Sequence, residues 1–358
     1  MEEHILQIRN LKMYYEIKQG LLAFRKDPIY VKAVDDVSFN INKGEIYGLV
    51  GESGCGKTTT GRCIARLEDP TDGSILFREH DIAKIPKKDL RAFRKNVQMI
   101  FQDPYESLNP RFTVFQAVAD PLTVHAREQN IEERLDAVVK ALDDAGLKNP
   151  HDLLERFPHE LSGGQRQRVA IARALIVDPK FIVADEPVSM LDVSIRAGVM
   201  NLMLDIKERL QIAYLFVTHD VAIARYMSDN LGVMYLGDIV ESAKTDDLIN
   251  NATHPYTRAL LSAVPIPDPD YEWVDVPIKG DIPSPINLPK GCRFHPRCVW
   301  ARDVCKESSP EPIEVAEGHF VKCFFAEEMY GSEELPPIPE LEKPVPVAVS
   351  EEASEDDQ

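Results

Sequence analysis

A glycine-rich stretch that ends in Lys and Thr is the first candidate for chemistry. It consists of Gly51-Glu52-Ser53-Gly54-Cys55-Gly56-Lys57-Thr58 and follows the apolar run 46–50. Glycines let backbone N–H groups curl around phosphate oxygens, a Lys reaches the β- and γ-phosphates, and a Thr hydroxyl ligates Mg²⁺. A helix that begins here would favour the same anion. The alternative is a chance match in a strand-to-helix turn, and the full pattern after a buried-type strand favours a nucleotide site.

Two adjacent carboxylates follow a second apolar run. Residues 181–184 are Phe-Ile-Val-Ala, and Asp185 and Glu186 come directly after them. Asp185 is placed to hold Mg²⁺, directly or through water, and Glu186 to polarise a water that attacks the γ-phosphate. Acids can also simply end a strand. The phosphate loop in the same chain favours the catalytic interpretation.

Cysteines form a third candidate group. Six are present, and the spacing of the last four is C-x5-C-x6-C-x17-C. In a reducing compartment this concentration suggests metal before disulfide. The spacing matches neither the tight pairs of structural zinc sites nor the common short ferredoxin run, so it leaves an iron–sulfur cluster, zinc and free thiols open. We interpret Cys55 and Cys63 as small packing residues. The four late cysteines are Cys292, Cys298, Cys305 and Cys323.

Alternating apolar residues and turn signals predict the elements that carry the phosphate loop. A polar insertion around residues 18–28 lies between the first two predicted strands and is expected to be a surface loop. Asp72-Gly73 is expected to begin a hairpin whose second strand includes residues 75–77. The predicted elements are strands at 5–15, 31–42, 46–50, 75–77 and 97–101 and a helix at 58–67.

The strand pattern stops after residue 101 and returns at 181. Residues 114–156 carry apolar side chains at helical spacing, which predicts a helical insert. A helix at 166–176, the strand 181–184, a helix around 199–206 and a strand at 215–217 follow. Strands that alternate with helices, with chemistry at the strand ends, predict a largely parallel α/β core.

Composition and charge limit the function classes. The chain has 358 residues, a net charge of −18 and an acidic balance that argues against an electrostatic DNA binder. No apolar stretch approaches the roughly 20 residues needed to cross a bilayer, and residues 1–4 lack the pattern of a signal peptide. We therefore expect a cytosolic protein whose membrane role comes through partners.

The texture of the chain changes at about Pro265. Prolines punctuate residues 265–289 without a sustained period, which predicts extended chain and turns. Residues 332–358 hold five prolines and nine acidic residues and are expected to be disordered. The expected domains are a nucleotide-binding domain at 1–262 with a helical insert at about 103–175, a four-cysteine segment at 263–330, and an acidic, Pro-rich tail at 331–358.

A further motif is the run Leu161-Ser162-Gly163-Gly164-Gln165, which lies between the phosphate loop and the two adjacent carboxylates in the sequence. A Ser hydroxyl and two Gly N–H groups at a helix N-terminus form a second anion site. Together with the phosphate loop and Asp185-Glu186, this run resembles the signature of the ATP-binding-cassette (ABC) family, which implies an ABC-type fold with a mixed sheet core. The resemblance covers roughly residues 5–240. It implies Gln102 as the Q-loop glutamine, residues 189–192 as the D-loop and His219 as the switch histidine.

The resemblance also implies an ATPase that works as a dimer. In the family, the signature of one subunit grips the γ-phosphate bound to the other, so hydrolysis needs two subunits that sandwich two ATPs. The implied catalytic residues are Glu186, His219 and Gln102, and the implied Mg²⁺ ligands are Thr58, Gln102 and Asp185. Tyr15 is the aromatic expected to stack on adenine, with Tyr14 and Tyr30 as alternatives. The implied nucleotide contacts are Tyr15, Ser53, Gly54, Cys55, Gly56, Lys57, Thr58, Thr59, Gln102, Asp185, Ser162, Gly163, Gly164, Gln165 and Asp192.

Residues 101–110 and 254–265 closely resemble the oligopeptide/dipeptide branch of importer ATPases. Within that branch, residues 107–110 and 264–269 resemble the F-type subunit more than the D-type subunit. The resemblance implies peptide import at the cytoplasmic face of the membrane with two permease subunits, a second ATPase subunit (a D-type companion or a second copy) and an external solute-binding protein. An exposed apolar patch around residues 103–125 is expected to dock the permeases, unless it is the core of the insert.

The same branch resemblance extends to the late cysteines. Residues 292–298 and the two later cysteines resemble a segment that can hold a four-iron, four-sulfur cluster, and zinc is the alternative. Two other functions remain: import of another solute, such as an oligosaccharide or nickel, and a soluble ABC ATPase that acts on DNA or ribosomes. The long coiled coil, internal zinc modules or second cassette common in that soluble class are absent from the sequence, and we expect no nucleic-acid partner.

Overall fold

The computed structural model describes residues 4–17, 28–126, 130–264 and 276–332. Three segments with sequence predictions lie outside the described residues. They are the polar insertion at 18–27, the start of the Pro-rich segment at 265–275 and the acidic tail at 333–358. Among the described helices, none has both the length and the apolar character that a bilayer crossing requires.

The larger of the two described sheets holds the phosphate-loop strand near its centre. Its eight described strands run in the order β11 (Ile313–Ala316), β12 (His319–Val321), β10 (Asp238–Lys244), β9, β3, β8, β7, β6. β3 pairs in parallel with β8 and β9, and β7 pairs in parallel with β8 and β6. Every residue of β3, β7 and β8 is buried, as in parallel strands covered on both faces. The predicted α/β core is confirmed. The bounds are β3 (Ile46–Val50), β6 (Val97–Ile100), β7 (Phe181–Asp185), β8 (Ala213–Thr218) and β9 (Asn230–Tyr235).

The parallel strands bring the candidate residues to one edge of this sheet. β3 leads into the phosphate loop, β7 ends at Asp185 before Glu186, and β8 ends before His219. β6 lies beside β7 and leads to Gln102. Because the carboxyl ends of parallel strands share an edge, residues more than a hundred positions apart become neighbours.

A second, antiparallel sheet packs against the first, and it corrects one prediction: residues 75–77 belong to the first strand of a hairpin and not to the second. Asp72 and Gly73 belong to a strand, since Asp72 pairs with Lys12 of β1. The added Cβ of a residue at position 73 would lie 2.4 Å from the Asn10 carbonyl oxygen, so this glycine permits close strand approach. The turn instead lies at Arg78 and Glu79, both with positive φ. The strands, in spatial order, are β2 (Ile29–Asn42), β1 (His4–Ile17), β4 (Asp72–Phe77) and β5 (His80–Asp81).

One apolar core fills the space between the two sheets, with helix α1 (Lys57–Ile64) packed into it. It contains Leu6 and Ile41 from the antiparallel sheet, Leu215 from the eight-stranded sheet, and Cys63 from α1. Cys55 belongs to the same core. Burial of both cysteines confirms that they pack in the interior.

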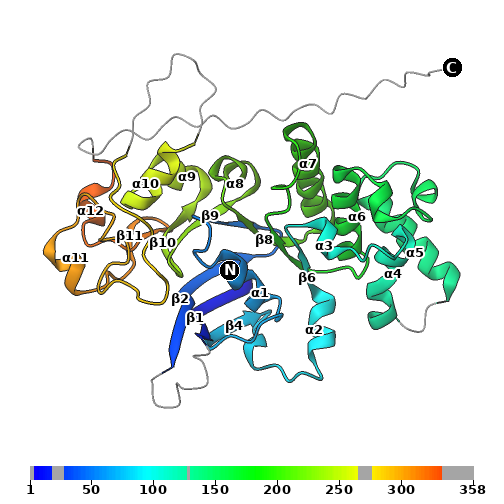
Figure 1. Cartoon of the computed structure of the whole chain (residues 1–358), viewed down its shortest axis with the longest axis horizontal. Coiled ribbons are helices and arrows are strands. Elements are labelled where there is room, and N and C mark those ends of the chain that lie inside the picture. The colour runs from blue at the N-terminus through cyan, green and yellow to red at the C-terminus, as the bar shows by residue number, and fades with distance from the viewer. Residues whose placement is uncertain (1–3, 18–27, 127–129, 265–275, 333–358) are drawn as a thin grey trace.

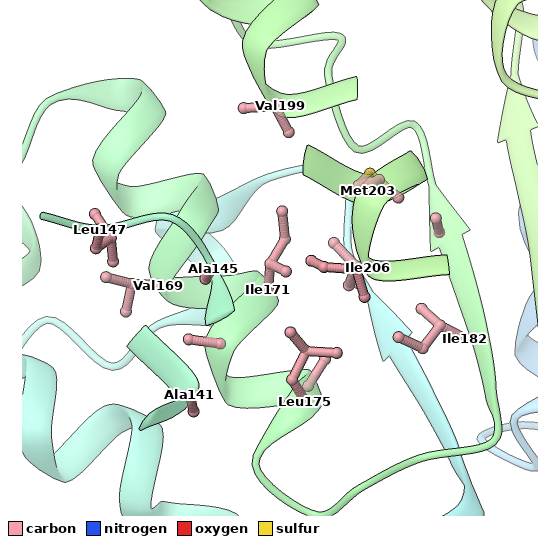
Figure 2. Packing of buried hydrophobic residues seen from close by; sticks show 14 of the residues in the cluster. Ala141, Ala145, Leu147, Val169, Ile171, Leu175, Ile182, Val199, Met203 and Ile206 are labelled. Carbon is pink, nitrogen blue, oxygen red and sulfur yellow. The ribbon is translucent and has the colours of Figure 1, made fainter. Parts of the chain in front are cut away.

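Helices occupy most of residues 103–175, and their buried side chains share one core with a face of the main sheet. Figure 1 shows α3 to α6 gathered at one end of the molecule. Figure 2 shows Val169, Ile171 and Leu175 of α6 packed toward α7 and toward Ala141 and Ala145. The bounds are α2 (Leu90–Asn96), α3 (Pro104–Ser107), α4 (Val114–His125), α5 (Ile131–Asp144), α6 (Gly163–Leu175) and α7 (Val193–Leu210), with short 3-10 helices at Ile82–Lys84, Pro150–Leu153 and Pro158–Glu160.

The C-terminal segment is more regular than the sequence indicated. Its strand β12 (His319–Val321) pairs antiparallel with β10 (Asp238–Lys244), and β11 (Ile313–Ala316) pairs with β12. The segment therefore extends the main sheet. Strands of three and four residues have no sustained alternation, which explains why the sequence did not reveal them. The nearby helices are α8 (Val221–Met227), α9 (Thr245–Asn250), α10 (Pro255–Ser262), α11 (Asp303–Glu307) and α12 (Ala326–Met329).

Candidate nucleotide-binding site

The phosphate loop connects β3 to α1 in a conformation that only glycine fits. Gly56 has φ +111°, and a Cβ there would lie 2.1 Å from the Ala33 carbonyl oxygen. A Cβ on Gly51 would lie equally close to the Met234 carbonyl oxygen. Gly54 also has positive φ but borders open space. The loop is thus fixed on its inner side and free on its outer side, where a ligand can approach.

Lys57 places a positive charge inside this loop. Its Nζ donates hydrogen bonds to the carbonyl oxygens of Gly51, at 2.7 Å, and Glu52, at 3.0 Å. The Cys55 sulfur lies 3.7 Å from the same nitrogen. Burial raises the pKa of the Cys55 thiol, so the thiol stays neutral beside the ammonium. The thiol therefore adds no negative charge beside the Lys57 ammonium.

The first helical turn reaches the acidic end of β7. Thr58 Oγ1 donates a hydrogen bond to Asp185 Oδ1 at 2.9 Å. Burial raises the pKa of the Asp185 carboxyl, which means that its ionised form is poorly solvated here. A hydroxyl and a carboxylate with oxygens this close are suitable donors for Mg²⁺. The structure thus brings together two of the three predicted Mg²⁺ ligands.

The third predicted ligand, Gln102, contacts Glu186 instead. Gln102 Nε2 donates to Glu186 Oε2 at 2.9 Å, and His219 Nδ1 lies 2.9 Å from Glu186 Oε1. The backbone of Glu186 has φ +45° and donates its N–H to the Val217 carbonyl. Both carboxylate oxygens are thus held by side chains that follow the two strands flanking β7. The three predicted catalytic residues form one cluster.

The signature residues lie in the helical insert, away from this cluster. Ser162 caps α6, since its Oγ accepts from Gln165 N at 3.3 Å and Gln165 returns a bond to Ser162 N. Gly164 packs so tightly that an added Cβ would lie 2.6 Å from Ile195. Figure 1 shows α6 in the helical insert and α1 beside β1. Ser162 is exposed at this helix start, and the predicted contact Asp192 is exposed directly before α7.

One of the three candidate aromatics lies beside α1. The Tyr15 hydroxyl hydrogen bonds with Glu68 and with Thr59, and burial followed by the Glu68 bond raises its pKa to about 12. Its ring remains 37% exposed. The Tyr14 hydroxyl is instead bound to Asp35. Tyr15 is therefore a partly exposed aromatic residue in contact with the phosphate-loop helix.

The four late cysteines converge in the C-terminal segment as free thiols. Cys323 lies close enough to interact electrostatically with the other three, and burial raises its pKa to about 12. Backbone N–H groups hydrogen bond to the sulfurs of Cys292, Cys298 and Cys323. Within the described residues, however, no group of three or more His, Cys, Asp or Glu side chains is arranged to hold a metal ion.

The sequence interpretation missed a contact between this segment and the phosphate loop. Arg297 donates two hydrogen bonds to Glu52, at 2.7 and 3.0 Å. The available signal was Glu52 itself, because an acidic residue in an anion-binding loop needs a positive partner.

Comparison with known proteins agrees with these features. Residues 34–189 match the ABC transporter family, and residues 240–305 match the family described as oligopeptide/dipeptide transporter, C-terminal region. The chain is 48% identical over 325 residues to the oligopeptide transport ATP-binding protein AppF of Bacillus subtilis (strain 168), which covers 90% of this chain and 97% of AppF. It is also 48% identical to OppF of the same organism, over 91% of this chain and 98% of OppF.

A solved structure shares the nucleotide-binding fold. The dimeric ATP-binding cassette MJ0796 in a post-hydrolysis state, bound to ADP and Pi, superposes with a TM-score of 0.58 at 30% identity over 67% of this chain and 98% of that one. The chain therefore belongs to the ATP-binding subunits of ABC transporters, in the oligopeptide/dipeptide transporter family.

Proposed function

We propose that this protein hydrolyses ATP to drive import of peptides through membrane permease subunits. The observation that carries the proposal is the Glu186 carboxylate, which is held on both oxygens by Gln102 and His219 next to the Thr58–Asp185 pair. A carboxylate in this position can orient a water for attack on a γ-phosphate. The names of AppF and OppF support an oligopeptide cargo.

The protein residues divide the chemistry between binding and water activation. Lys57 and the loop N–H groups bind the phosphates, and Tyr15 stacks on the adenine. Thr58 and Asp185 would hold Mg²⁺, which would supply charge neutralisation at the phosphates. Glu186 accepts a hydrogen bond from the attacking water, and His219 fixes the orientation of that carboxylate. Gln102 completes this water site from the end of β6.

A second ATPase subunit completes each site. Ser162 and Gly164 open α6 with backbone N–H groups that suit an anion, yet they lie in the helical insert rather than beside their own phosphate loop. A partner's signature would cover the bound nucleotide, and Asp192 would lie at the same junction. The partner is a D-type companion or a second copy of this chain.

A groove between the nucleotide-binding layer and the helical insert suits a short helix from a permease. It has a volume of about 170 Å³ and is lined by Leu67, Phe101, Ser107, Pro121 and Arg173, among others. Leu67 is 46% exposed and Phe101 37% exposed. Because Phe101 precedes Gln102, a helix bound here can move the water site.

The proposed docking groove differs from the patch around residues 103–125 that the sequence predicted. Most apolar side chains of that patch are buried in the core of the insert, including Leu108, Val114, Val118 and Leu122. Tyr105 remains 59% exposed, and Ser107 and Pro121 line the groove. The patch is therefore mainly core, and the exposed apolar surface lies at its border with α1 and β6.

We also propose that the four late cysteines hold a four-iron, four-sulfur cluster. Their mutual electrostatic contact and the N–H bonds to three sulfurs support a thiolate site. Zinc, which takes four sulfurs at about 2.3 Å, is the alternative, and the described side chains form no ready-made site for either group.

Uptake by reconstituted vesicles tests the transport function. Vesicles that contain the chain together with its permeases and solute-binding protein should import labelled oligopeptides. The import should require ATP on the cytoplasmic face, where this chain would be bound. Leu67→Asp should abolish copurification with the permeases, whereas Ile131→Asp, at a 75% exposed position of α5, should not. Uptake of an oligosaccharide or nickel in place of peptide would overturn the cargo. ATPase activity without any permease association would overturn the transport function.

A further inference from the structure

The C-terminal cysteine segment contacts the phosphate loop through one buried ion pair. Both terminal nitrogens of Arg297 donate to the two carboxylate oxygens of Glu52, at 2.7 and 3.0 Å. The Arg297 side chain is only 5% exposed and that of Glu52 27%. The hydrogen bonds that Arg297 donates to Glu52 raise the pKa of Arg297 above its ordinary range. Such a two-point, charge-assisted contact fixes direction as well as distance.

An aromatic cluster holds the same contact rigid. Tyr256 accepts a hydrogen bond from the Glu52 backbone N–H at 2.9 Å and is itself almost fully buried. Its ring lies 4.6 Å from that of Tyr235 and 5.5 Å from that of Phe294. The Arg297 guanidinium lies over the Tyr235 and Phe294 rings. Backbone and side chain of Glu52 are therefore both held by residues that come late in the chain.

The turn that carries Arg297 is anchored at its other end as well. Arg293 donates to the Leu236 carbonyl at 2.7 Å and to Asp35 at 2.8 Å. Between the two arginines, Arg297 N and Cys298 N both donate to the Phe294 carbonyl. The turn 292–298 is thus a stiff bridge from β2 and the β9–β10 connection to the phosphate loop.

Electrostatics gives this bridge a consequence for nucleotide binding. Glu52 is negative and lies in the loop that must surround a polyphosphate, so a free carboxylate there would repel the ligand. The bidentate contact neutralises this carboxylate and directs it toward the C-terminal segment. Without Arg297, the charge would be released at the mouth of the anion site.

We propose that Arg297 is a positioning residue of the ATP site, which neutralises Glu52 and holds the phosphate loop open to the nucleotide. The inference rests on the nucleotide site proposed above. It gives the C-terminal segment a part in ATP binding in addition to whatever its thiols hold.

A double-mutant cycle on the full chain tests the proposal. Arg297→Gln should raise KM for ATP about tenfold or more, as expected for loss of a charge-assisted pair. The kcat at saturating ATP should change less than about threefold, because Arg297 touches no reacting atom. Glu52→Gln in the Arg297→Gln background should restore most of the affinity, since the repelling charge is gone. Arg302→Gln is the control, because it removes an exposed ion pair of the same segment and should leave KM unchanged.

Several results would overturn the proposal. An unchanged KM for ATP in Arg297→Gln would show that Arg297 has no role in ATP binding. A double variant that binds ATP no better than Arg297→Gln would also contradict the proposal, because Glu52→Gln does not repair a purely structural loss. If Arg297→Gln does not fold, Arg297→Lys tests the neutralisation by itself, since it keeps the charge and loses the two-point geometry. Its KM for ATP should stay within about threefold of the wild type, and a tenfold rise would contradict a role for the charge. Unchanged ATP affinity in Lys57→Ala would instead count against the nucleotide site itself.

Discussion

The side chain of His219 lies 2.9 Å from Glu186, on the carboxylate oxygen that Gln102 leaves free. These two residues follow neighbouring parallel strands and are 33 positions apart in the chain. Because both oxygens have a partner, the Glu186 carboxylate has one orientation available. A group that must accept a hydrogen bond from an attacking water is thereby fixed before the nucleotide arrives.

Replacement of Glu186 by Gln should separate ATP binding from hydrolysis. Gln keeps the shape of the carboxylate but cannot activate water, so turnover should fall about 10²-fold or more, while ATP binds as in the wild type. Phosphate release and equilibrium binding of labelled ATP measure the two effects. The variant should also accumulate as a closed dimer with ATP. Turnover within twofold of wild type would show that another group activates the water.

Asp185→Asn should stabilise the nucleotide-free fold at neutral pH. Burial raises the pKa of Asp185 from 3.8, so the ionised carboxylate costs folding free energy above its folded pKa. This cost disappears as the pH falls through the folded pKa toward 3.8. The variant should therefore have the higher Tm at pH 7.5 in EDTA, and the difference should shrink at acidic pH. A Tm difference that is constant with pH would contradict the raised pKa.

Ser162→Ala should lower the ATPase rate strongly, although it should lower the free energy of unfolding only slightly. Loss of the helix cap costs about 1 kcal/mol, and the same loss occurs in Asn130→Ala, which removes the cap of α5. The signature variant should in addition lower the ATPase rate of the assembled dimer about tenfold or more. Chemical denaturation and ATPase assays on both variants make the comparison. Equal effects of both variants on the rate would leave Ser162 with only a capping role.

Anaerobic purification should yield a brown protein with about four iron and four sulfide per chain. Cys323→Ala should lose this iron, whereas Cys63→Ala, which lies in the core between the sheets, should keep it. Iron and sulfide analysis together with the visible spectrum provide the readout. Stoichiometric zinc in a colourless preparation would identify a zinc site, and metal-free protein would leave four structural thiols.

Local sequence determined those parts of the site that lie within one strand and the turn after it. The phosphate loop needs glycines at fixed offsets before Lys57, and the strand that ends in Asp185-Glu186 needs only a buried run and two acids. The capping pair Ser162 and Gln165 is equally local. Such patterns can be recognised because a few adjacent residues set the backbone conformation and the chemistry together.

Tertiary structure alone decided which residues meet. The short strand β12 was not visible in the sequence because its three residues have too little periodicity, and pairing with β10 creates it. Asp72-Gly73 resembled a turn, but close approach to Asn10 places both residues in a strand. Arg297 and Glu52 are 245 positions apart, and only the order of strands around β3 brings their charges into contact. Long-range pairing of this kind depends on the packing of the whole sheet, which no local pattern encodes.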